Sequence, residues 1–333
     1  MARRKKSEKT RFRTSTAGRK PQKYRKRKRT VSGSKGKKTK NLSGYTTVTI
    51  SLCLLIGIII WNSVKGNVHK PADDDLRVHF IDVGQGDCIY ISCGGENMLI
   101  DCGEKSAYDN VIRYLNREET VSLDYVIATH PHSDHMGGMA EVIDYYDNVG
   151  EVIIPPLTKD AIPLTTFFSD FLDIVEEKEI PLTQARVGMK GTLGDAEWRI
   201  ISPFECDEEN LNNCSVGIIL KHGENSFCFT GDAEDEAEKT MVYSGVTEDV
   251  DVFKMAHHGS DTSNTELFLM ATRPEIAVVS CGAGNSYGHP NDGAMARIKT
   301  YAEEIYRTDL DGNIIMKSDG KEISVTTKGD SLW

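Results

Sequence analysis

The sequence predicts an α/β fold in which helices cover two β-sheets, preceded by a basic disordered tail and one N-terminal transmembrane helix. Three observations support this prediction. Residues 1–40 contain 19 of the chain's 40 lysines and arginines and one acid, Glu8. Residues 41–64 carry no charged side chain. After residue 76, apolar strand-like runs alternate with segments of helical spacing, a pattern typical of sheets that carry helices on their faces.

The basic segment has almost no large aliphatic side chains. Such a segment cannot bury enough apolar surface to offset the entropy lost on ordering, so residues 1–44 are expected to form a disordered tail. A nucleic-acid-binding arm, a nuclear-type basic signal and a cytoplasmic tail all share this composition. The apolar segment that follows favours a cytoplasmic tail, whose charge suits anionic lipid headgroups.

Residues 45–64 are predicted to form an uncleaved signal anchor in the cell membrane. Twenty helical residues span about 30 Å, the thickness of a bilayer core. Trp61 lies near the end of the run, where interfacial aromatics are found. A cleaved signal peptide is the alternative, but its basic region is usually much shorter and no A-x-A site follows. The tail then stays in the cytoplasm, and a linker over 65–75 leads to an extracytoplasmic domain, residues 76–333.

The outer domain shows no repeat and no internal linker. Residues 76–93 predict two strands joined by a glycine-containing turn. Further strands are expected over 96–103, 122–130, 151–156, 198–203, 213–223, 225–232, 251–260 and 275–282, and a hairpin over 313–327. Helices are expected over 107–119, 136–147, 167–180, 233–245, 264–274 and 292–304. The acids along 234–243 predict a solvent-exposed helix face.

The segment THPHSDHMGG, residues 129–138, places His130, His132, Asp134 and His135 within six positions of a chain that has nine histidines. Pro131 prevents a regular helix, so the cluster is expected on a strand-to-helix loop where side chains can converge. Imidazole and carboxylate together suit zinc, manganese or iron. The alternative, polar residues that merely cap the next helix, is disfavoured because FTGD and MAHHGS also follow apolar strands.

The run His130-x-His132-x-Asp134-His135 resembles the signature of the metallo-β-lactamase superfamily. Within it, the outer domain is most similar to the ComEC-type hydrolase domain of competence DNA-uptake proteins. The further motifs that carry this resemblance are HFIDVGQGD (79–87), LIDCG (99–103), NNCS (212–215), FTGD (229–232), HHGS (257–260) and YGHP (287–290). The resemblance implies an αββα sandwich with two divalent metal ions, zinc or manganese, at one edge of the two sheets.

The resemblance also implies a role for each motif residue. The expected ligands are His130 and His132 for the first ion, Asp134, His135 and the late histidine His257 for the second, and Asp232 as the bridge. Catalysis is expected to use Asp134 and Asp232 to hold the ions and the attacking water, and His258 or His289 to protonate the leaving oxygen. Residues expected to orient ligands or to line the mouth are Asp82, Gln85, Asp87, Asp101, Asn213, Ser215 and Ser260.

One position departs from the broad superfamily pattern. A histidine usually precedes the bridging aspartate and completes the first metal site, whereas this chain has Asn213-Cys214-Ser215. His222 is the nearest histidine, but it lies in an expected hairpin turn and is rejected as a ligand. Water or His289 would then complete the first site, so the two sites are expected to differ in affinity.

The resemblance implies a membrane-anchored phosphodiesterase or nuclease that acts on extracellular DNA. Outside residues 1–40, the chain has 21 of its 40 lysines and arginines and 49 of its 50 aspartates and glutamates, a net charge of about −28. This charge opposes tight binding of a polyanion. A phosphodiesterase for a cell-wall polymer or a small phosphodiester, and a non-catalytic surface module that retains the fold, are therefore the alternatives. No P-loop or Rossmann fingerprint is present, so no nucleotide cofactor is expected. The oligomeric state is not indicated.

Eight cysteines leave the redox state open. Cys53 lies in the expected span, and the other seven form no CxxC motif. Several stand in apolar runs, where cysteine behaves as a small buried hydrophobe. Disulfides in the outer domain are possible on this evidence, but their pairing is not predicted.

Overall fold

The computed structural model describes residues 75–159, 161–206 and 209–328. The chain divides into residues 1–68 and a compact unit of residues 69–333, to which all described residues belong. The expected basic tail, the expected membrane span at 45–64 and nearly all of the linker lie outside the described residues. Within the described part, no helix is both long enough and apolar enough to cross a membrane.

The described residues form two sheets. The first has eight strands in the order β15-β14-β1-β2-β3-β4-β5-β6. Its strands are β1 Leu76–Phe80, β2 Ile89–Cys93, β3 Glu96–Ile100, β4 Leu123–Ile127, β5 Val149–Ile154, β6 Leu182–Gln184, β14 Asn313–Ser318 and β15 Ile323–Lys328. Strands β14, β1, β2 and β3 pair antiparallel, whereas β3 to β6 pair parallel.

The second sheet has seven strands in the order β13-β12-β11-β10-β9-β8-β7. Its strands are β7 Lys190–Leu193, β8 Ala196–Ser202, β9 Gly217–His222, β10 Asn225–Phe229, β11 Val252–Lys254, β12 Ile276–Val279 and β13 Glu304–Arg307. Strands β7 to β10 pair antiparallel and β10 to β13 pair parallel. Each sheet therefore has an antiparallel and a parallel half.

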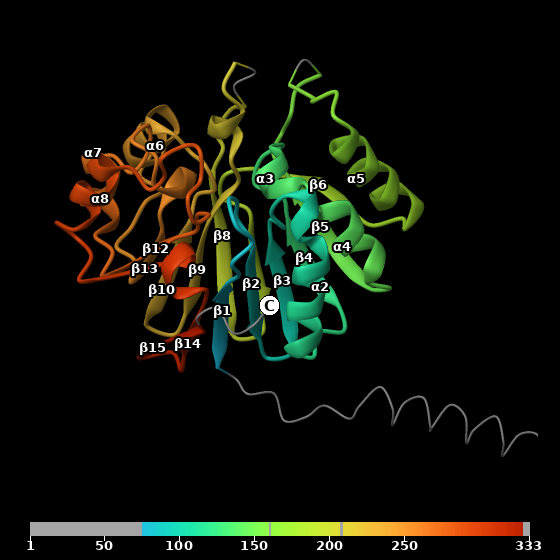
Figure 1. The fold of residues 1–333 in the computed structure, drawn as a ribbon, viewed down its shortest axis with the longest axis horizontal. Coiled ribbons are helices and arrows are strands. Elements are labelled where there is room, and N and C mark those ends of the chain that lie inside the picture. Colours follow the sequence, from blue (N-terminus) through green and yellow to red (C-terminus); the bar gives the residue numbers. More distant parts are fainter. Residues whose placement is uncertain (1–74, 160, 207–208, 329–333) are drawn as a thin grey trace, which may run out of the picture. The chain divides into compact units, whose positions relative to one another are not determined.

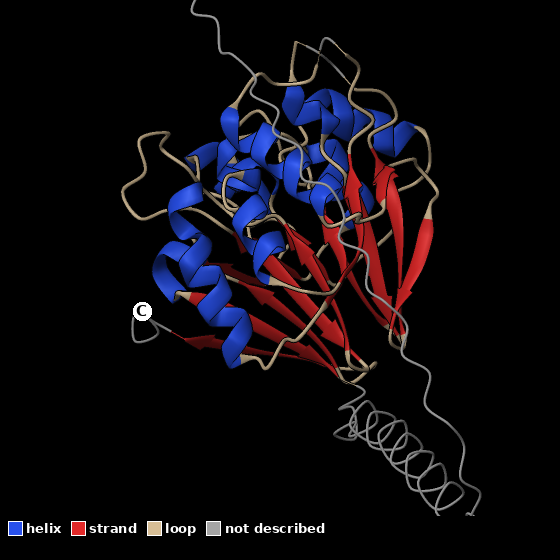
Figure 2. Cartoon of the chain, turned by 90° about the vertical axis from the view of Figure 1, so that its right-hand side faces the viewer, coloured by secondary structure: helices blue, strands red, loops and turns tan. Residues whose placement is uncertain are grey.

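Helices lie on the outer faces of both sheets (Figures 1 and 2). The α-helices are α2 Tyr108–Arg117, α3 Ser133–Met136, α4 Met139–Tyr145, α5 Thr166–Glu177, α6 Asp235–Tyr243, α7 Glu266–Thr272, α8 Asp292–Ile298 and α9 Thr308–Asp311, with 3-10 turns η1 Lys105–Ala107, η2 Leu211–Cys214 and η3 Ala256–Gly259. Helices α2, α4 and α5 pack on the first sheet, and α6, α7 and α8 pack on the second. The expected αββα sandwich is confirmed.

Alternation of side chains along the strands explains why both sheets are buried on two faces. In β2, Ile89 and Ile91 point between the sheets, whereas Tyr90 points to the helices of the first sheet. The rings of Phe80 and Phe229 join the two sheets across the central layer, 6.1 Å apart. Complete burial of one such side chain stabilises the fold by about 1.5–3 kcal/mol.

Most expected elements are present, with local differences. The helix expected over 136–147 is two helices, α3 and α4, separated at Gly137 and Gly138. A Cβ atom on Gly137 would lie 2.3 Å from the Ser133 carbonyl oxygen, so the chain passes too closely there for a side chain. The helix expected over 292–304 ends at Ile298, and its last expected residue begins β13 instead.

The topology brings four strand ends to one edge of the sandwich. Strands β3 and β4 are parallel neighbours in the first sheet, and β10 and β11 are parallel neighbours in the second. The loops after these strands carry Asp101, His130, Asp232 and His258, respectively. The residues expected to form the metal centre therefore come from both sheets and meet beside α3.

Candidate metal centre

The loop after β4 turns sharply enough to aim successive side chains at one region. His132 has an extended backbone and immediately precedes α3, so Asp134 and His135 lie on the first turn of that helix. The His132 amide donates a hydrogen bond to the His130 carbonyl oxygen (3.0 Å), which closes the loop around Pro131. His130 and His135 are fully buried. The rings of these two residues are 4.2 Å apart.

Asp134, His135, Asp232 and His258 offer four ligand atoms that all lie within 4.8 Å of one another. The Asp232 Oδ2 atom is 3.2 Å from His135 Nε2 and 3.5 Å from His258 Nε2. His258 Nε2 is also 3.3 Å from Asp134 Oδ2. Two imidazole nitrogens and two carboxylates at this spacing suit one divalent cation.

Hydrogen bonds on the opposite ring nitrogens orient both imidazoles. His135 Nδ1 is 2.7 Å from Asp101 Oδ2, and His258 Nδ1 is 3.0 Å from the Ser280 carbonyl oxygen. Both partners are acceptors, so each Nδ1 donates a hydrogen bond and each Nε2 points to the centre, where a cation would replace any proton on Nε2. Among the described residues, His135 Nε2, His258 Nε2 and Asp232 Oδ1 are buried without a hydrogen-bond partner. A cation would satisfy all three atoms, so the residues present fit a bound metal.

His130 and His132 form the other side of the centre. His130 Nε2 is 3.0 Å from His132 Nδ1 and 3.8 Å from Asp232 Oδ2. Ser215 belongs to the stretch that takes the place of the superfamily's usual histidine. Its hydroxyl accepts a hydrogen bond from the Asp232 amide at 3.0 Å and lies 3.4 Å from His130 Nδ1. Ser215 therefore braces Asp232 and His130. Both sites then have two imidazoles, but the first lacks a counterpart of Asp134 and so has one protein donor fewer than the second.

The surrounding charges shift several pKa values. Burial disfavours the charged form of Asp232, but His135 and His258 outweigh burial and hold the pKa of Asp232 well below its usual range. Burial lowers the pKa of His258, but the carboxylates of Asp232 and Asp87 outweigh it and raise that pKa to about 9. Burial and the neighbouring His135 lower the pKa of His130.

The structure places His257 and His258 differently with respect to the other candidate ligands. His257 was expected as the late ligand of the second ion, but His258 is the residue grouped with Asp134, His135 and Asp232. His257 Nε2 lies 3.7 Å from Asp232, while its Nδ1 faces Glu234 at 3.2 Å and its side chain is partly exposed. Both histidines have left-handed φ values, 51° and 54°, and their rings lie 6.1 Å apart with planes at 67°.

A buried ion pair between Lys254 and Asp87 packs against the centre. Asp87 was expected at the site, whereas Lys254 was not. Lys254, at the end of β11, lies 2.7 Å from Asp87 Oδ2, and both residues are almost completely buried. Asp87 Oδ1 lies 3.3 Å from His258 Nδ1. Burial opposes ionisation of Asp87, but Lys254 and His258 lower its pKa to about 2. The available signal was a lone lysine in an apolar strand, three residues before the histidine pair.

The GQGD loop packs directly onto the ligand loop. The Asp87 amide donates to the Asp134 carbonyl oxygen at 3.1 Å. A Cβ atom on Gly86, whose φ is 138°, would lie 2.2 Å from that oxygen, so only glycine fits. Asp82 was expected at the site, but its carboxylate accepts the Gly84 amide and holds the turn.

The mouth of the centre is a cavity of about 350 Å³. It is lined by Gln85, His132, Ser133, Asp134, Asn212, Asp232, His257, His258, Tyr287 and His289. Asn213 and Ser260 lie beside it: Asn213 Oδ1 accepts the Glu234 amide, and the Ser260 hydroxyl is 3.0 Å from that of Thr262. His289 thus lines the same cavity as Asp232 and His258.

A disulfide lies close in sequence to Asn212, which lines the mouth. Cys206 and Cys214 are bonded, and Cys214 immediately precedes Ser215. The loop between them carries Asn212, which donates to Glu234 Oε1 at 3.0 Å. The described cysteines outside this bond are all buried. The sequence did not indicate this pairing.

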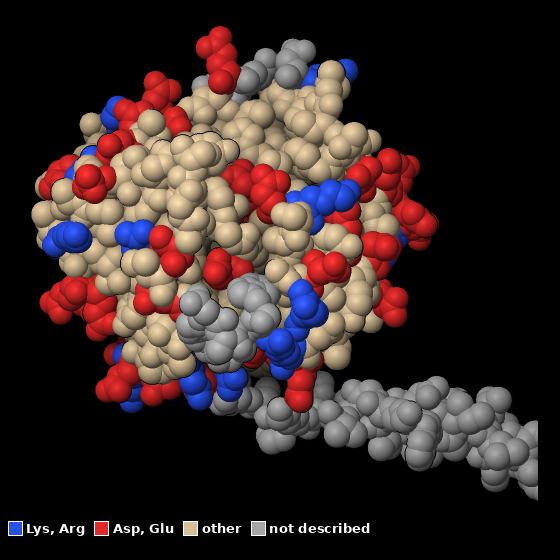
Figure 3. All heavy atoms as spheres, in the orientation of Figure 1, with Lys and Arg blue, Asp and Glu red and all other residues tan. Residues whose placement is uncertain are grey.

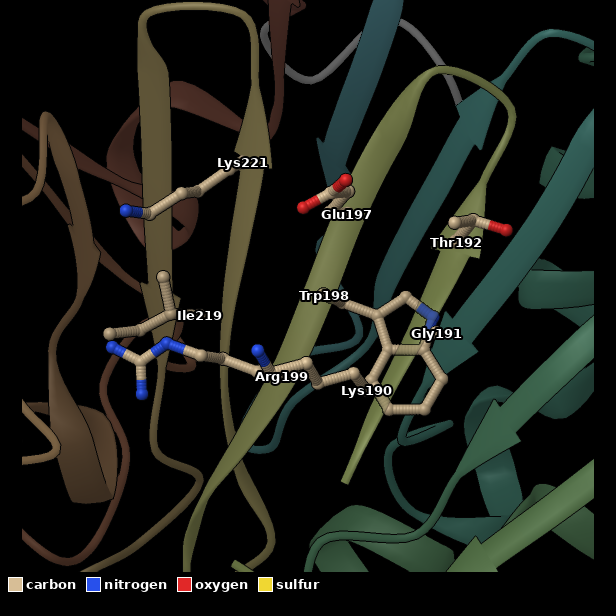
Figure 4. A pocket seen from close by; sticks show the side chains of 8 residues that line it. All are labelled: Lys190, Gly191, Thr192, Glu197, Trp198, Arg199, Ile219 and Lys221. Atoms are coloured by element: carbon tan, nitrogen blue, oxygen red, sulfur yellow. The ribbon is translucent and has the colours of Figure 1, made fainter. Parts of the chain in front are cut away.

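A second hollow lies away from the centre, on strands β7, β8 and β9 (Figure 4). It contains Lys190, Arg199 and Lys221, but Arg199 and Lys221 are both paired with Glu248. None of the residues of the metal centre lines it.

Comparisons with known proteins agree with the motifs. Residues 81–159 match the family model described as the Metallo-beta-lactamase superfamily. The chain is 27% identical over 290 residues to ComE operon protein 3 of Bacillus subtilis (80% of this chain, 35% of that protein). It is 29% identical over 243 residues to Recombination protein 2 of Haemophilus influenzae (72% of this chain, 28% of that protein). The matches thus span about a third of the length of these relatives.

Among solved structures, the metallo-beta-lactamase fold protein YhfI from Bacillus subtilis is similar, with a TM-score of 0.50 and 12% identity over 74% of this chain and 100% of that chain. At this identity the likeness concerns the fold alone. The resemblance expected from the motifs, to the metallo-β-lactamase superfamily and to competence proteins within it, is confirmed.

Proposed function

We propose that this chain, a metallo-hydrolase of the metallo-β-lactamase superfamily related to competence proteins, is a membrane-anchored phosphodiesterase whose catalytic domain lies outside the cytoplasm. The observation that carries the proposal is a set of buried atoms without a hydrogen-bond partner, His135 Nε2, His258 Nε2 and Asp232 Oδ1, next to a cavity that His258 and Asp232 line. A purely structural cluster would pair these atoms within the protein.

The residues divide into ligands and a proton donor. His135, His258, Asp134 and Asp232 would hold one divalent ion, and His130 and His132 with Asp232 would hold a second, zinc or manganese in each case. Bound divalent ions supply Lewis-acid polarisation of a phosphoryl oxygen and lower the pKa of water towards ~7. Because His258 faces the ligand group, His289 is the better candidate for protonating the leaving oxygen. His289 lines the mouth, and its ring lies 5.4 Å from that of His257.

Nucleic acid is the proposed substrate class. The relatives named for recombination and for competence support it. The acidic domain opposes tight binding of a long polyanion, and on the face in Figure 3 basic side chains form separate groups among acidic ones. This charge favours a second candidate, a phosphodiesterase for a small phosphodiester or a cell-wall polymer.

The proposed location rests on the charge pattern of residues 1–64 and on the Cys206–Cys214 disulfide. Disulfides persist in oxidising compartments outside the cytoplasm. Protease added to intact cells should degrade the domain after residue 70 and spare residues 1–40. A protected catalytic domain, in cells whose known surface proteins are digested, would contradict this orientation.

The activity test uses ligand variants of the full chain in detergent. With added manganese or zinc, the protein should hydrolyse bis-p-nitrophenyl phosphate, and His132→Ala and Asp134→Asn should each reduce turnover at least about 100-fold, because each removes a ligand. Asp249→Asn, at an exposed position paired with Arg273, is the matched control and should keep full activity. Folded protein that holds metal and cleaves no diester would favour the binding-module alternative.

A further inference from the structure

One exposed aromatic side chain stands at the mouth of the metal centre. Tyr287 is 67% exposed, although tyrosine normally buries most of its ring. Its ring lies nearly parallel to that of His289, with centroids 5.8 Å apart and planes at 23°. The imidazole therefore supports one face of the phenol ring, and the exposed fraction leaves ring surface open beside the cavity.

The backbone that carries Tyr287 is firmly held. Asn285 Oδ1 accepts the amides of Tyr287 (3.1 Å) and His289 (3.0 Å), and Asn285 Nδ2 donates to the carbonyl oxygens of Gly282 and His289. The Gly282 amide in turn donates to Gln85 Oε1 at 3.1 Å. Because this backbone is held and the Tyr287 ring stacks on His289, Tyr287 loses less conformational freedom when a ligand packs on it.

Apart from the metal centre, the cavity offers little positive charge to hold a phosphodiester. None of the residues that line it is a lysine or an arginine. Proteins that bind nucleic acids usually obtain most of their affinity from such cations. A substrate that reaches this mouth must therefore be held by the metal centre and by contacts that do not depend on positive charge. Base–aromatic stacking is such a contact, and it contributes about 1–3 kcal/mol per base.

We propose that Tyr287 stacks on the nucleobase next to the scissile phosphodiester, which makes the substrate a single-stranded nucleic acid or a nucleotide diester. A base inside a duplex has no free face for such a contact. A sugar- or polyol-phosphate polymer lacks the flat π-face that this ring selects. The inference rests on the proposed phosphodiesterase function and adds to it the residue that contacts the base and the preference for an unpaired base.

Two chromogenic diesters test the inference by turnover of the full-length protein. Thymidine 5′-(4-nitrophenyl) phosphate carries a base, methyl 4-nitrophenyl phosphate does not, and both release 4-nitrophenol. Tyr287→Ala should lower kcat/KM roughly 5- to 100-fold on the thymidine ester, chiefly through KM, because one stacked base is lost. It should leave the methyl ester within about twofold. Tyr287→Phe should retain both activities, and Tyr243→Ala, at an exposed tyrosine away from the cavity, is the matched control.

A binding measurement separates this inference from the proposed function. Fluorescence anisotropy with manganese present should show tighter binding of labelled oligothymidylate than of an abasic oligomer of equal length, and Tyr287→Ala should abolish the difference. If neither ester is cleaved but the base preference depends on Tyr287, the inference stands and the phosphodiesterase function fails. If the esters are cleaved and Tyr287→Ala changes neither turnover nor base preference, the inference is overturned and the function stands.

Discussion

Two neighbouring histidines have different chemical surroundings in this protein. His258 is buried, its Nδ1 faces the Ser280 carbonyl oxygen, and its Nε2 faces Asp134 and Asp232. His257 is partly exposed and faces Glu234. A metal ligand needs a fixed ring whose free nitrogen points at its partners, and His258 meets that condition better than His257.

The two positions give a paired prediction. His258→Gln should weaken the affinity for the metal at least about tenfold, because it removes an imidazole from the ligand group. His257→Gln should retain most of the metal. Elemental analysis of the two purified variants after identical dialysis measures both. Loss of metal in His257→Gln with full retention in His258→Gln would restore the assignment expected from the sequence.

The ligand types could be predicted from the sequence, but the direction of each side chain could not. Spacing within residues 130–135 places imidazoles and carboxylates on one loop, and this is a local property. Which of His257 and His258 points inward depends on two left-handed backbone angles set by distant residues. The partners of Lys254 and of Cys206 are likewise set by the tertiary structure and cannot be predicted from local spacing.

At the scale of elements, the turn after β11 is held by the segment that leads into α7. Asn264 is fully buried; its Oδ1 accepts the Ala256 amide at 2.9 Å, and its Nδ2 donates to the Ala256 and Ser260 carbonyl oxygens. Glu238 of α6 in turn accepts the Asn264 and Thr265 amides at 2.6 and 2.8 Å. This chain of contacts fixes the strained turn that aims His258.

Glu238 also corrects an expectation. The acids along 234–243 predicted a solvent-exposed helix face, yet Glu238 is completely buried. Burial raises its pKa from 4.5 to about 7, and the hydrogen bonds from Thr265 and Asn264 offset only part of that effect. A list of acids cannot show which one turns inward to meet two backbone amides.

A pH dependence of stability follows from Glu238. Its pKa is higher in the folded than in the unfolded state, so the folded state binds the proton more tightly. The resulting contribution to the free energy of unfolding is fully present below about pH 4.5. As the pH rises to about 7 the contribution is lost, which lowers the free energy of unfolding by up to about 3 kcal/mol. Urea unfolding of the wild type and of Glu238→Gln between pH 5 and 8 should show a shallower fall in the variant. Equal slopes would contradict the shifted pKa.

The sheets were more predictable than their edges. Strands such as β2 and β10 alternate apolar side chains between two buried faces, which gives them a high apolar content. The short strands β6 and β7 form one edge of each sheet and are largely exposed. Their residues carry no apolar run, and β7 contains Gly191, over which the Trp198 ring packs too closely for a side chain. Edge strands of this kind are defined by their neighbours.

At the scale of the whole molecule, net charge opposes the proposed substrate. The net charge of about −28 outside the basic tail repels a polyanion, and the cavity has no lysine or arginine to attract one. Salt screens exposed charges over roughly 10 Å at 0.1 M. Cleavage of single-stranded oligonucleotide should therefore stay constant or improve as NaCl rises from about 50 to 200 mM, measured as kcat/KM. A steep decline would point to basic contacts that dominate binding.

The central claim is that the imidazoles and carboxylates gathered at the edge of the two sheets form a hydrolytic metal centre. The most direct measurement follows bis-p-nitrophenyl phosphate hydrolysis and bound metal together, on the same full-length protein, as metal is removed with a chelator and then returned as manganese or zinc. Activity should disappear with the metal and return in proportion to the metal rebound. Activity that survives in protein shown to be free of metal, or metal that rebinds fully without restoring hydrolysis, would contradict the account.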